Sequence, residues 1–192
     1  MSAQSLIHEG KAAPRQTHVL LIGIGTYENL IGGPGPLAPD HFGLGQLTSP
    51  PASARLLADW FITNFDCPDR PLGTLRMLLS EASSAKFQHP GTGAQHSVPE
   101  ANLVNTRAAV ADWIDAAANP DDQIIFYLCG HGLSGGLNEI YPLRDFGCDD
   151  PADDGPLARA INLNKFAVGL ETVTASNQLL ILDTCRERET NS

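Results

Sequence analysis

The sequence predicts an α/β fold, in which a mostly parallel sheet carries helices on both faces and so forms three layers. Short, nearly continuous apolar runs are typical of strands that are buried on both faces. Four such runs span residues 18–24, 74–79, 123–129 and 178–183. Segments with helical spacing of apolar residues lie between them, at residues 53–65, 107–118 and 163–172. Strands that alternate with helices favour a parallel sheet with right-handed crossovers.

The ends of these elements follow from local signals. Ser53 and Thr106 are candidate N-caps for the first two helices, and Asn119 with Pro120 ends the second one. Residues 28–51 are rich in Gly and Pro, and residues 80–105 are polar, so both segments are expected to be loops. Residues 1–17 show no sustained period. We expect a flexible N-terminal tail there, followed by one domain over residues 18–192.

Composition excludes several classes of protein. The chain has 192 residues, with 12 Lys and Arg against 22 Asp and Glu, for a formal net charge of −10. This negative charge repels phosphate backbones and argues against a nucleic-acid partner. The longest apolar runs are too short for a membrane span, and no secretory leader is recognisable, so we expect no membrane partner and a cytoplasmic protein. The four cysteines are then expected to be free thiols.

Two reactive residues follow strands of the predicted sheet. His131 lies just past the third apolar run, between two glycines, and Cys185 lies just past the last run, 54 residues later. In parallel sheets, ligands and reactive groups gather beyond the carboxyl ends of the strands. A thiol near an imidazole can lose its proton and become a strong nucleophile for acyl transfer. The alternative is a structural thiol in the core and an unrelated histidine.

The order of several segments favours the first interpretation. The segments are HVLLIGIGTY, SARLLADWF, TRAAVADWI, IIFYLCGHG, EIYPLRD and LLILDTC. Together, over about residues 18–187, they resemble the caspase-like family of cysteine endopeptidases, which includes metacaspases and their bacterial relatives. Their most specific parts are a strand ending in Gly-His-Gly and a strand ending in Asp-x-Cys about 50 residues later. The resemblance implies a three-layer caspase-like sandwich and hydrolysis of protein or peptide substrates through a thioester.

The resemblance also implies roles for single residues. His131 is similar to the catalytic base and Cys185 to the nucleophile, with the backbone amides of Gly132 and Cys185 as the oxyanion hole. Asp183 matches an acidic pocket residue that binds Arg or Lys in metacaspases. Ser53 stands where those enzymes carry a second pocket Asp. We therefore expect cleavage after Arg or Lys, with a pocket that is only half acidic; the alternative role of Asp183 is to brace the strand end.

Other interpretations of the same residues are weaker. The run from Gly132 to Gly136 matches the nucleophile elbow of serine hydrolases at Ser134, but no histidine follows His131 and no helix follows the serine. A zinc site is not expected, because Cys129, His131, Cys148 and Cys185 match no standard zinc spacing. We expect Cys67 to be a thiol in a turn, Cys129 a thiol in the core and Cys148 a thiol in a loop. The acidic residues 145–154 suit calcium, which some metacaspases need, but match no EF-hand. We expect no cofactor, with calcium as the alternative.

The last part of the sequence suggests a partner. Seven residues follow Cys185, whereas in the caspase-like family further strands and helices form a small subunit. We expect the chain to be a large subunit that lacks these strands, matured from a zymogen by an upstream protease or by self-cleavage near Arg186 or Arg188, and paired with a small-subunit polypeptide. The resemblance suggests regulated cell death or antiviral defence as the setting. The alternative function is a catalytically silent caspase-like scaffold that binds partners.

Overall fold

The computed structural model of the chain describes residues 5–135, 138–148, 157–185 and 187–188. Its centre is a five-stranded sheet with the strand order β1-β3-β2-β6-β10. The strands are β1 (Leu6–Glu9), β2 (Thr17–Ile24), β3 (Leu72–Ser80), β6 (Gln123–Gly130) and β10 (Asn177–Thr184). The last four run parallel, and β1 pairs antiparallel with β3. The predicted α/β class and the mostly parallel sheet are confirmed.

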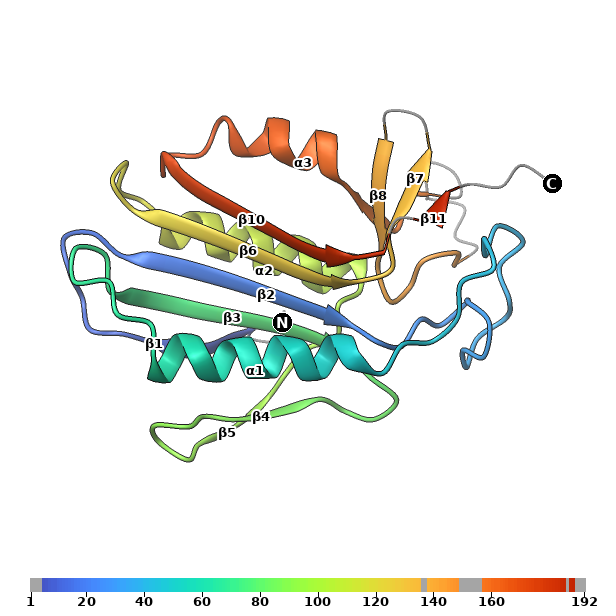
Figure 1. Cartoon of the computed structure of the whole chain (residues 1–192), viewed down its shortest axis with the longest axis horizontal. Helices are drawn as coiled ribbons and strands as arrows, with labels where there is room; N and C mark the ends of the chain where they lie inside the picture. The colour runs from blue at the N-terminus through green and yellow to red at the C-terminus, as the bar shows by residue number, and fades with distance from the viewer. Residues whose placement is uncertain (1–4, 136–137, 149–156, 186, 189–192) are drawn as a thin grey trace.

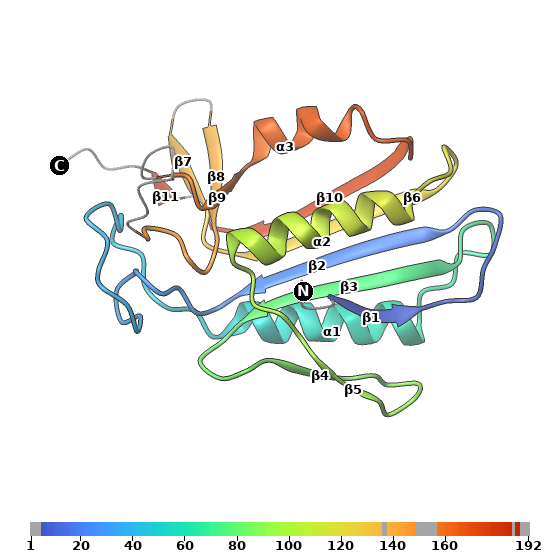
Figure 2. The ribbon, with the colours of Figure 1, turned by 180° about the vertical axis from the view of Figure 1, so that it is seen from behind.

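Helices cover both faces of this sheet. Helix α1 (Ser49–Thr63) crosses the front face in Figure 1, and α2 (Leu103–Ala116) and α3 (Leu163–Leu170) lie behind it, as Figure 2 shows. Alternate residues of β2 point to opposite faces of the sheet and belong to two different core clusters. Leu21 belongs to the cluster that packs on α1, and Leu20 to the cluster that contains Trp113 of α2. Every residue of β2 is buried, which explains its continuous apolar run.

Two smaller sheets complete the fold. A hairpin of β4 (Lys86–Gln88) and β5 (Gln95–Ser97) lies within the segment expected to be a polar loop. A second sheet has the order β11-β7-β8-β9 and stands at the carboxyl end of β6 and β10 (Figure 1). Its strands are β7 (Leu133–Gly135), β8 (Asn138–Pro142), β9 (Ala160–Asn162) and β11 (Glu187–Arg188).

The expected flexible tail over residues 1–17 is wrong for residues 6–9. These residues form β1 on the outer side of β3, with Leu6 opposite Arg76 and Glu9 opposite Thr74. Ile7 is buried against the core on the α1 side. Pairing with β3 therefore orders a segment that is too short to show a strand period by itself.

The predicted helix starts also need correction. Helix α1 begins at Ser49 rather than near Ser53, because Pro50 and Pro51 occupy its first turn, where a fixed φ suits the helix. Helix α2 begins at Leu103. Its N-cap is Asn102, whose side chain accepts the backbone N–H of Asn105 at 2.9 Å, whereas Thr106 lies within the first turn.

Two histidines, His8 half-buried and His18 buried, make the stability of the fold depend on pH. The Nδ1 of His89 accepts the backbone N–H groups of Gly91 and Thr92, so its Nε2 carries the hydrogen that is donated to Nδ1 of His8 at 2.9 Å. Burial, and then the neighbouring His89, lowers the pKa of His8. Burial also lowers the pKa of His18, partly offset by Asp122. Both rings therefore fold in the neutral form.

The free energy of unfolding is expected to fall as the pH drops below the ordinary histidine value of 6.5. Below that value the unfolded chain binds protons that the folded chain still excludes, so the loss continues until the folded-state pKa is passed. Urea titrations over the range of about pH 5 to 8 measure it. The variant His8→Gln should show a smaller loss than the native chain. An identical pH dependence in the two proteins would contradict the assignment for His8.

All four cysteines lie within the described residues and are free thiols, as predicted. Helices of the described residues are also too short or too polar to cross a membrane.

Candidate active site

His131 and Cys185 follow two neighbouring strands at the same edge of the sheet. β6 and β10 pair in parallel register, with Cys129 opposite Asp183 and Gly130 opposite Thr184. His131 and Cys185 are the next residues along the two strands. The expectation that these strands are neighbours is confirmed, and the register brings the two positions side by side.

The imidazole of His131 is held by the loop that connects β2 to α1. Its Nε2 lies 2.9 Å from the backbone carbonyl oxygen of Gly45, in the loop that precedes α1. A carbonyl oxygen only accepts hydrogen bonds, so Nε2 carries the hydrogen and donates it. The neutral ring then keeps its lone pair on Nδ1, which is the nitrogen that can accept a proton.

The backbone of His131 has a second partner from the same loop. Its N–H donates to the hydroxyl oxygen of Tyr27 at 2.9 Å, and the two rings lie 5.0 Å apart between centroids. Tyr27 is fully buried just after β2, and burial raises the pKa of its hydroxyl, which therefore stays protonated. Neither Gly45 nor Tyr27 was predicted from the sequence. A backbone carbonyl has no side-chain signature, and Tyr27 reads as an ordinary core residue.

Cys185 is exposed, whereas the nearby Cys129 is buried. Burial raises the pKa of Cys129 to about 11, with further contributions from Asp183 and Cys185 and an opposing one from the Tyr127 hydroxyl. Cys129 is thus a protonated thiol near neutral pH and a poor nucleophile. Its electrostatic interaction with Cys185 places the two thiols in one neighbourhood.

Gly132 lies directly against the chain that follows β10. A Cβ at this position would collide with the carbonyl oxygen of Cys185 and crowd the side chain of Thr184. Glycine therefore allows the two segments to approach here. This contact brings the predicted oxyanion-hole residues, Gly132 and Cys185, next to each other.

Asp183, the predicted pocket residue, faces the side of the sheet that carries α1. Its Oδ2 accepts the Tyr127 hydroxyl at 3.1 Å. Burial, together with the Cys129 thiol and the Asp183 carboxylate, raises the pKa of Tyr127, so this hydroxyl stays a donor. Ser53 lies half-buried in the second turn of α1 rather than at its N-cap. Its helix neighbour Leu57 packs on the cluster that contains Tyr127 and Cys129, so α1 and Asp183 border the same face.

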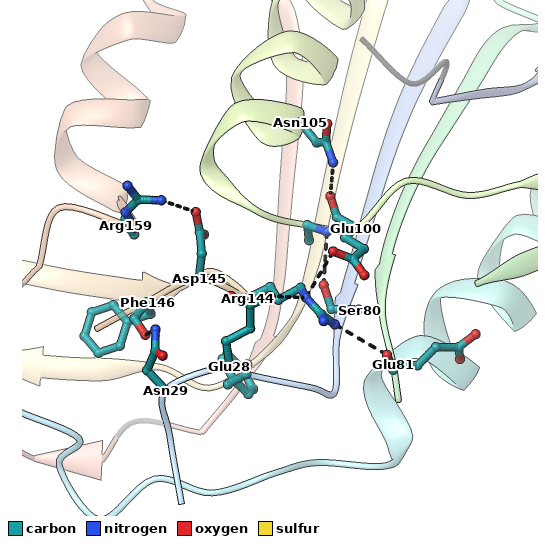
Figure 3. Close-up of polar contacts among 12 residues, drawn as sticks. Glu28, Asn29, Ser80, Glu81, Glu100, Asn105, Arg144, Asp145, Phe146 and Arg159 are labelled. Atoms are coloured by element: carbon teal, nitrogen blue, oxygen red, sulfur yellow. Dashed lines mark hydrogen bonds and ion pairs between the residues drawn. The ribbon is translucent and has the colours of Figure 1, made fainter. Parts of the chain in front are cut away.

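An arginine ties together three loops at this edge (Figure 3). The Nε of Arg144 lies 3.2 Å from a carboxylate oxygen of Glu28 and 3.1 Å from one of Glu100. Its backbone N–H donates to Ala101, and its carbonyl accepts from Glu28. Because Glu28 adjoins Tyr27, this network fixes the start of the loop that contacts His131.

Structure also bears on the other interpretations. Ser134 lies in β7, opposite Glu139 of β8, and in the described part of the chain the next element is β8 rather than a helix, which does not fit a nucleophile elbow. Cys148 is exposed and Cys67 half-buried. Within the described residues, no three His, Cys, Asp or Glu side chains are grouped to hold a metal. Of the acidic loop, Asp145 pairs with Arg159 at 2.8 Å, whereas residues 149–154 lie outside the described residues.

Comparison with known proteins assigns no activity to this chain. No protein-family model matches the sequence. It is similar to an uncharacterized protein, y4kE, of Sinorhizobium fredii (strain NBRC 101917 / NGR234), with 33% identity over 114 residues. The match covers 50% of this chain and 31% of the relative, so it spans about a third of that protein's length.

Proposed function

We propose that this chain is the large-subunit domain of a caspase-like cysteine endopeptidase. The observation that carries the proposal is the pairing of β6 with β10, which sets His131 beside Cys185 while Gly45 holds the hydrogen on Nε2 of the imidazole. A thiol next to an imidazole with a free Nδ1 is the arrangement that covalent acyl transfer requires.

The proposed reaction uses this chain's own groups at each step. Nδ1 of His131 takes the proton of the Cys185 thiol, and the sulfur attacks the carbonyl carbon of the scissile peptide bond. Backbone N–H groups of Gly132 and Cys185 hold the resulting oxyanion. The imidazolium then donates its proton to the leaving amine, and a thioester remains. Water, deprotonated by His131, hydrolyses the thioester and releases the second product.

The Gly45 carbonyl supports this proton transfer. When Nδ1 gains a proton, both ring nitrogens carry hydrogen and the ring is positively charged. An oxygen 2.9 Å from Nε2 stabilises that charged form and fixes the ring orientation. A carboxylate partner is therefore not needed, and the site works as a dyad with a backbone acceptor.

Asp183 sets the proposed preference for Arg or Lys at the residue before the cleaved bond. The hydroxyl of Tyr127 binds one carboxylate oxygen and orients the group. A fixed carboxylate on this face attracts a cationic side chain and repels an acidic one. Ser53 contributes a neutral hydroxyl where a second carboxylate would strengthen binding, so the preference rests on Asp183.

The proposal includes a partner strand beside β10. In the described part of the chain β10 is an edge strand, and its apolar side chains Leu179 and Ile181 are 45% and 37% exposed. Such an edge is prone to pair with another chain. A small-subunit polypeptide, provided after an activating cleavage, fits this edge. A monodisperse monomer of this chain with full activity would remove the need for it.

Labelling and hydrolysis test the proposed function together. The intact chain is incubated under reducing conditions with a peptide chloromethyl ketone that ends in Arg, and the adduct is mapped by mass spectrometry. We expect modification of Cys185, with buried Cys129 and exposed Cys148 as internal controls. A fluorogenic peptide ending in Arg should be cleaved and one ending in Asp left intact.

Each contrary outcome has a defined meaning. Cleavage after Asp with no cleavage after Arg would overturn the role of Asp183. An absence of both adduct and hydrolysis would favour the silent scaffold, in which the same fold only binds partners.

A further inference from the structure

Two contacts to His131 come from opposite ends of one loop. Tyr27 lies just after β2, and Gly45 lies shortly before α1, with a Gly- and Pro-rich segment between them. The Tyr27 hydroxyl accepts the backbone N–H of His131, and the Gly45 carbonyl accepts its Nε2–H. The loop therefore grips both the backbone and the ring of the same histidine.

Gln46 joins the two ends of this loop. Its Oε1 accepts the backbone N–H of Tyr27 at 2.8 Å, and its Nε2 donates to the carbonyls of Tyr27 and Ile31, each at 3.1 Å. Because Gln46 is the residue after Gly45, these bonds fix the spacing between the Gly45 carbonyl and Tyr27. The side chain is exposed, so burial does not require it to make three hydrogen bonds.

The Tyr27 hydroxyl fills a space left by the missing side chain of Gly130. A Cβ on Gly130 would come within 2.8 Å of this oxygen, so a glycine in β6 leaves the space that the hydroxyl fills. The hydroxyl then meets the first backbone N–H beyond the end of the strand, which is that of His131. Phenylalanine would fill most of the same volume but leave this N–H without its partner.

From these contacts we infer that Tyr27 is a positioning residue for His131 and that Gln46 sets its place. The inference rests on the proposed function, because it concerns the base of that reaction. Tyr27 acts through the backbone and the ring of His131. It holds the histidine so that Nε2 meets the Gly45 carbonyl and Nδ1 is left as the proton acceptor.

The variant Tyr27→Phe tests this inference in the full chain, with the fluorogenic Arg peptide as substrate. Misplaced reacting groups lose rate rather than binding, so we expect kcat to fall about tenfold to a hundredfold with KM nearly unchanged. The acidic limb of the kcat/KM profile should move to lower pH, because a weaker Gly45 contact favours the charged ring less. Tyr141→Phe is the matched control, since it removes another buried tyrosine hydroxyl, one bonded to Glu139.

A second variant and a spectroscopic measurement cover a failure to fold. Gln46→Glu keeps an acceptor for the Tyr27 N–H but places one carboxylate oxygen, in the position of Nε2, against the carbonyl oxygens of Tyr27 and Ile31. It should lower kcat as Tyr27→Phe does. Nitrogen-15 spectra of the histidine ring should show the Nε2–H form in the native chain and a mixture in Tyr27→Phe.

The outcomes separate the two ideas. If the native chain shows neither an adduct on Cys185 nor hydrolysis that depends on Cys185, the proposed function fails. If it forms the adduct without hydrolysis, the ring spectrum of Tyr27→Phe alone decides the positioning role. If it does hydrolyse the peptide, and Tyr27→Phe keeps its kcat, pH profile and ring spectrum, then only the positioning role is overturned. A loss of kcat of the same size in Tyr141→Phe would also overturn it.

Discussion

Replacing Cys185 by alanine is expected to lower kcat/KM for the Arg peptide by at least about a thousandfold, because the covalent step has no substitute nucleophile. The neighbouring thiol cannot take over. Cys129 is buried, and its pKa is raised to about 11, so it carries little thiolate near neutral pH. Initial rates with native and variant chains at equal concentration measure the effect.

The corresponding change at His131 tests whether the two residues act as one unit. His131→Ala alone should reduce kcat/KM nearly as much as Cys185→Ala, and the double variant should be no worse than either single one. Cys148→Ala is the control, since it removes another exposed thiol. Rates that multiply in the double variant would mean that the histidine does not serve the cysteine.

Trp113→Ala is expected to lower the free energy of unfolding by about 3 to 5 kcal/mol, as removal of a large buried side chain generally does. Trp113 is fully buried in α2, its Nε1 donates to the His18 carbonyl at 3.0 Å, and its ring lies 6.0 Å from that of Phe126. The change leaves a cavity and removes a hydrogen bond to a carbonyl of β2. Urea unfolding followed by circular dichroism measures it.

The other tryptophan provides the matched control. Trp60 is 47% exposed on α1 and contacts the rings of Phe61 and Phe65 at its edge. Trp60→Ala should therefore lower the free energy of unfolding by about 1 kcal/mol or less. Equal losses in the two variants would show that α2 does not cover the sheet as described.

The central strands could be predicted because their burial is written in the residues themselves. β2, β3, β6 and β10 each contain a run of apolar residues, and the predicted bounds match within two residues. β1 could not be found this way. Only Ile7 of its four residues is buried, and they form a strand through pairing with β3.

The candidate site was predictable only where a side chain carries the chemistry. His131 and Cys185 can be recognised in the sequence, because each is a chemically reactive residue just past an apolar run. The Gly45 carbonyl and the Tyr27 hydroxyl depend on how a loop of Gly and Pro residues folds back, and no residue type encodes that path. The helix starts failed for a related reason. Thr48 has no side-chain cap bond, and it is the prolines after it that set the beginning of α1.

The position of β10 has a consequence for motion. β6 is flanked by strands on both sides, whereas β10 has a neighbour on one side in the described part of the chain. Fraying of a margin strand needs far less free energy than global unfolding. Such fraying carries Cys185 away while His131, which follows the inner strand β6, stays bound to Tyr27 and Gly45. Local opening therefore needs less free energy at Cys185 than at His131. The fraction of time in which the thiol lies beside the imidazole depends on the opening of β10.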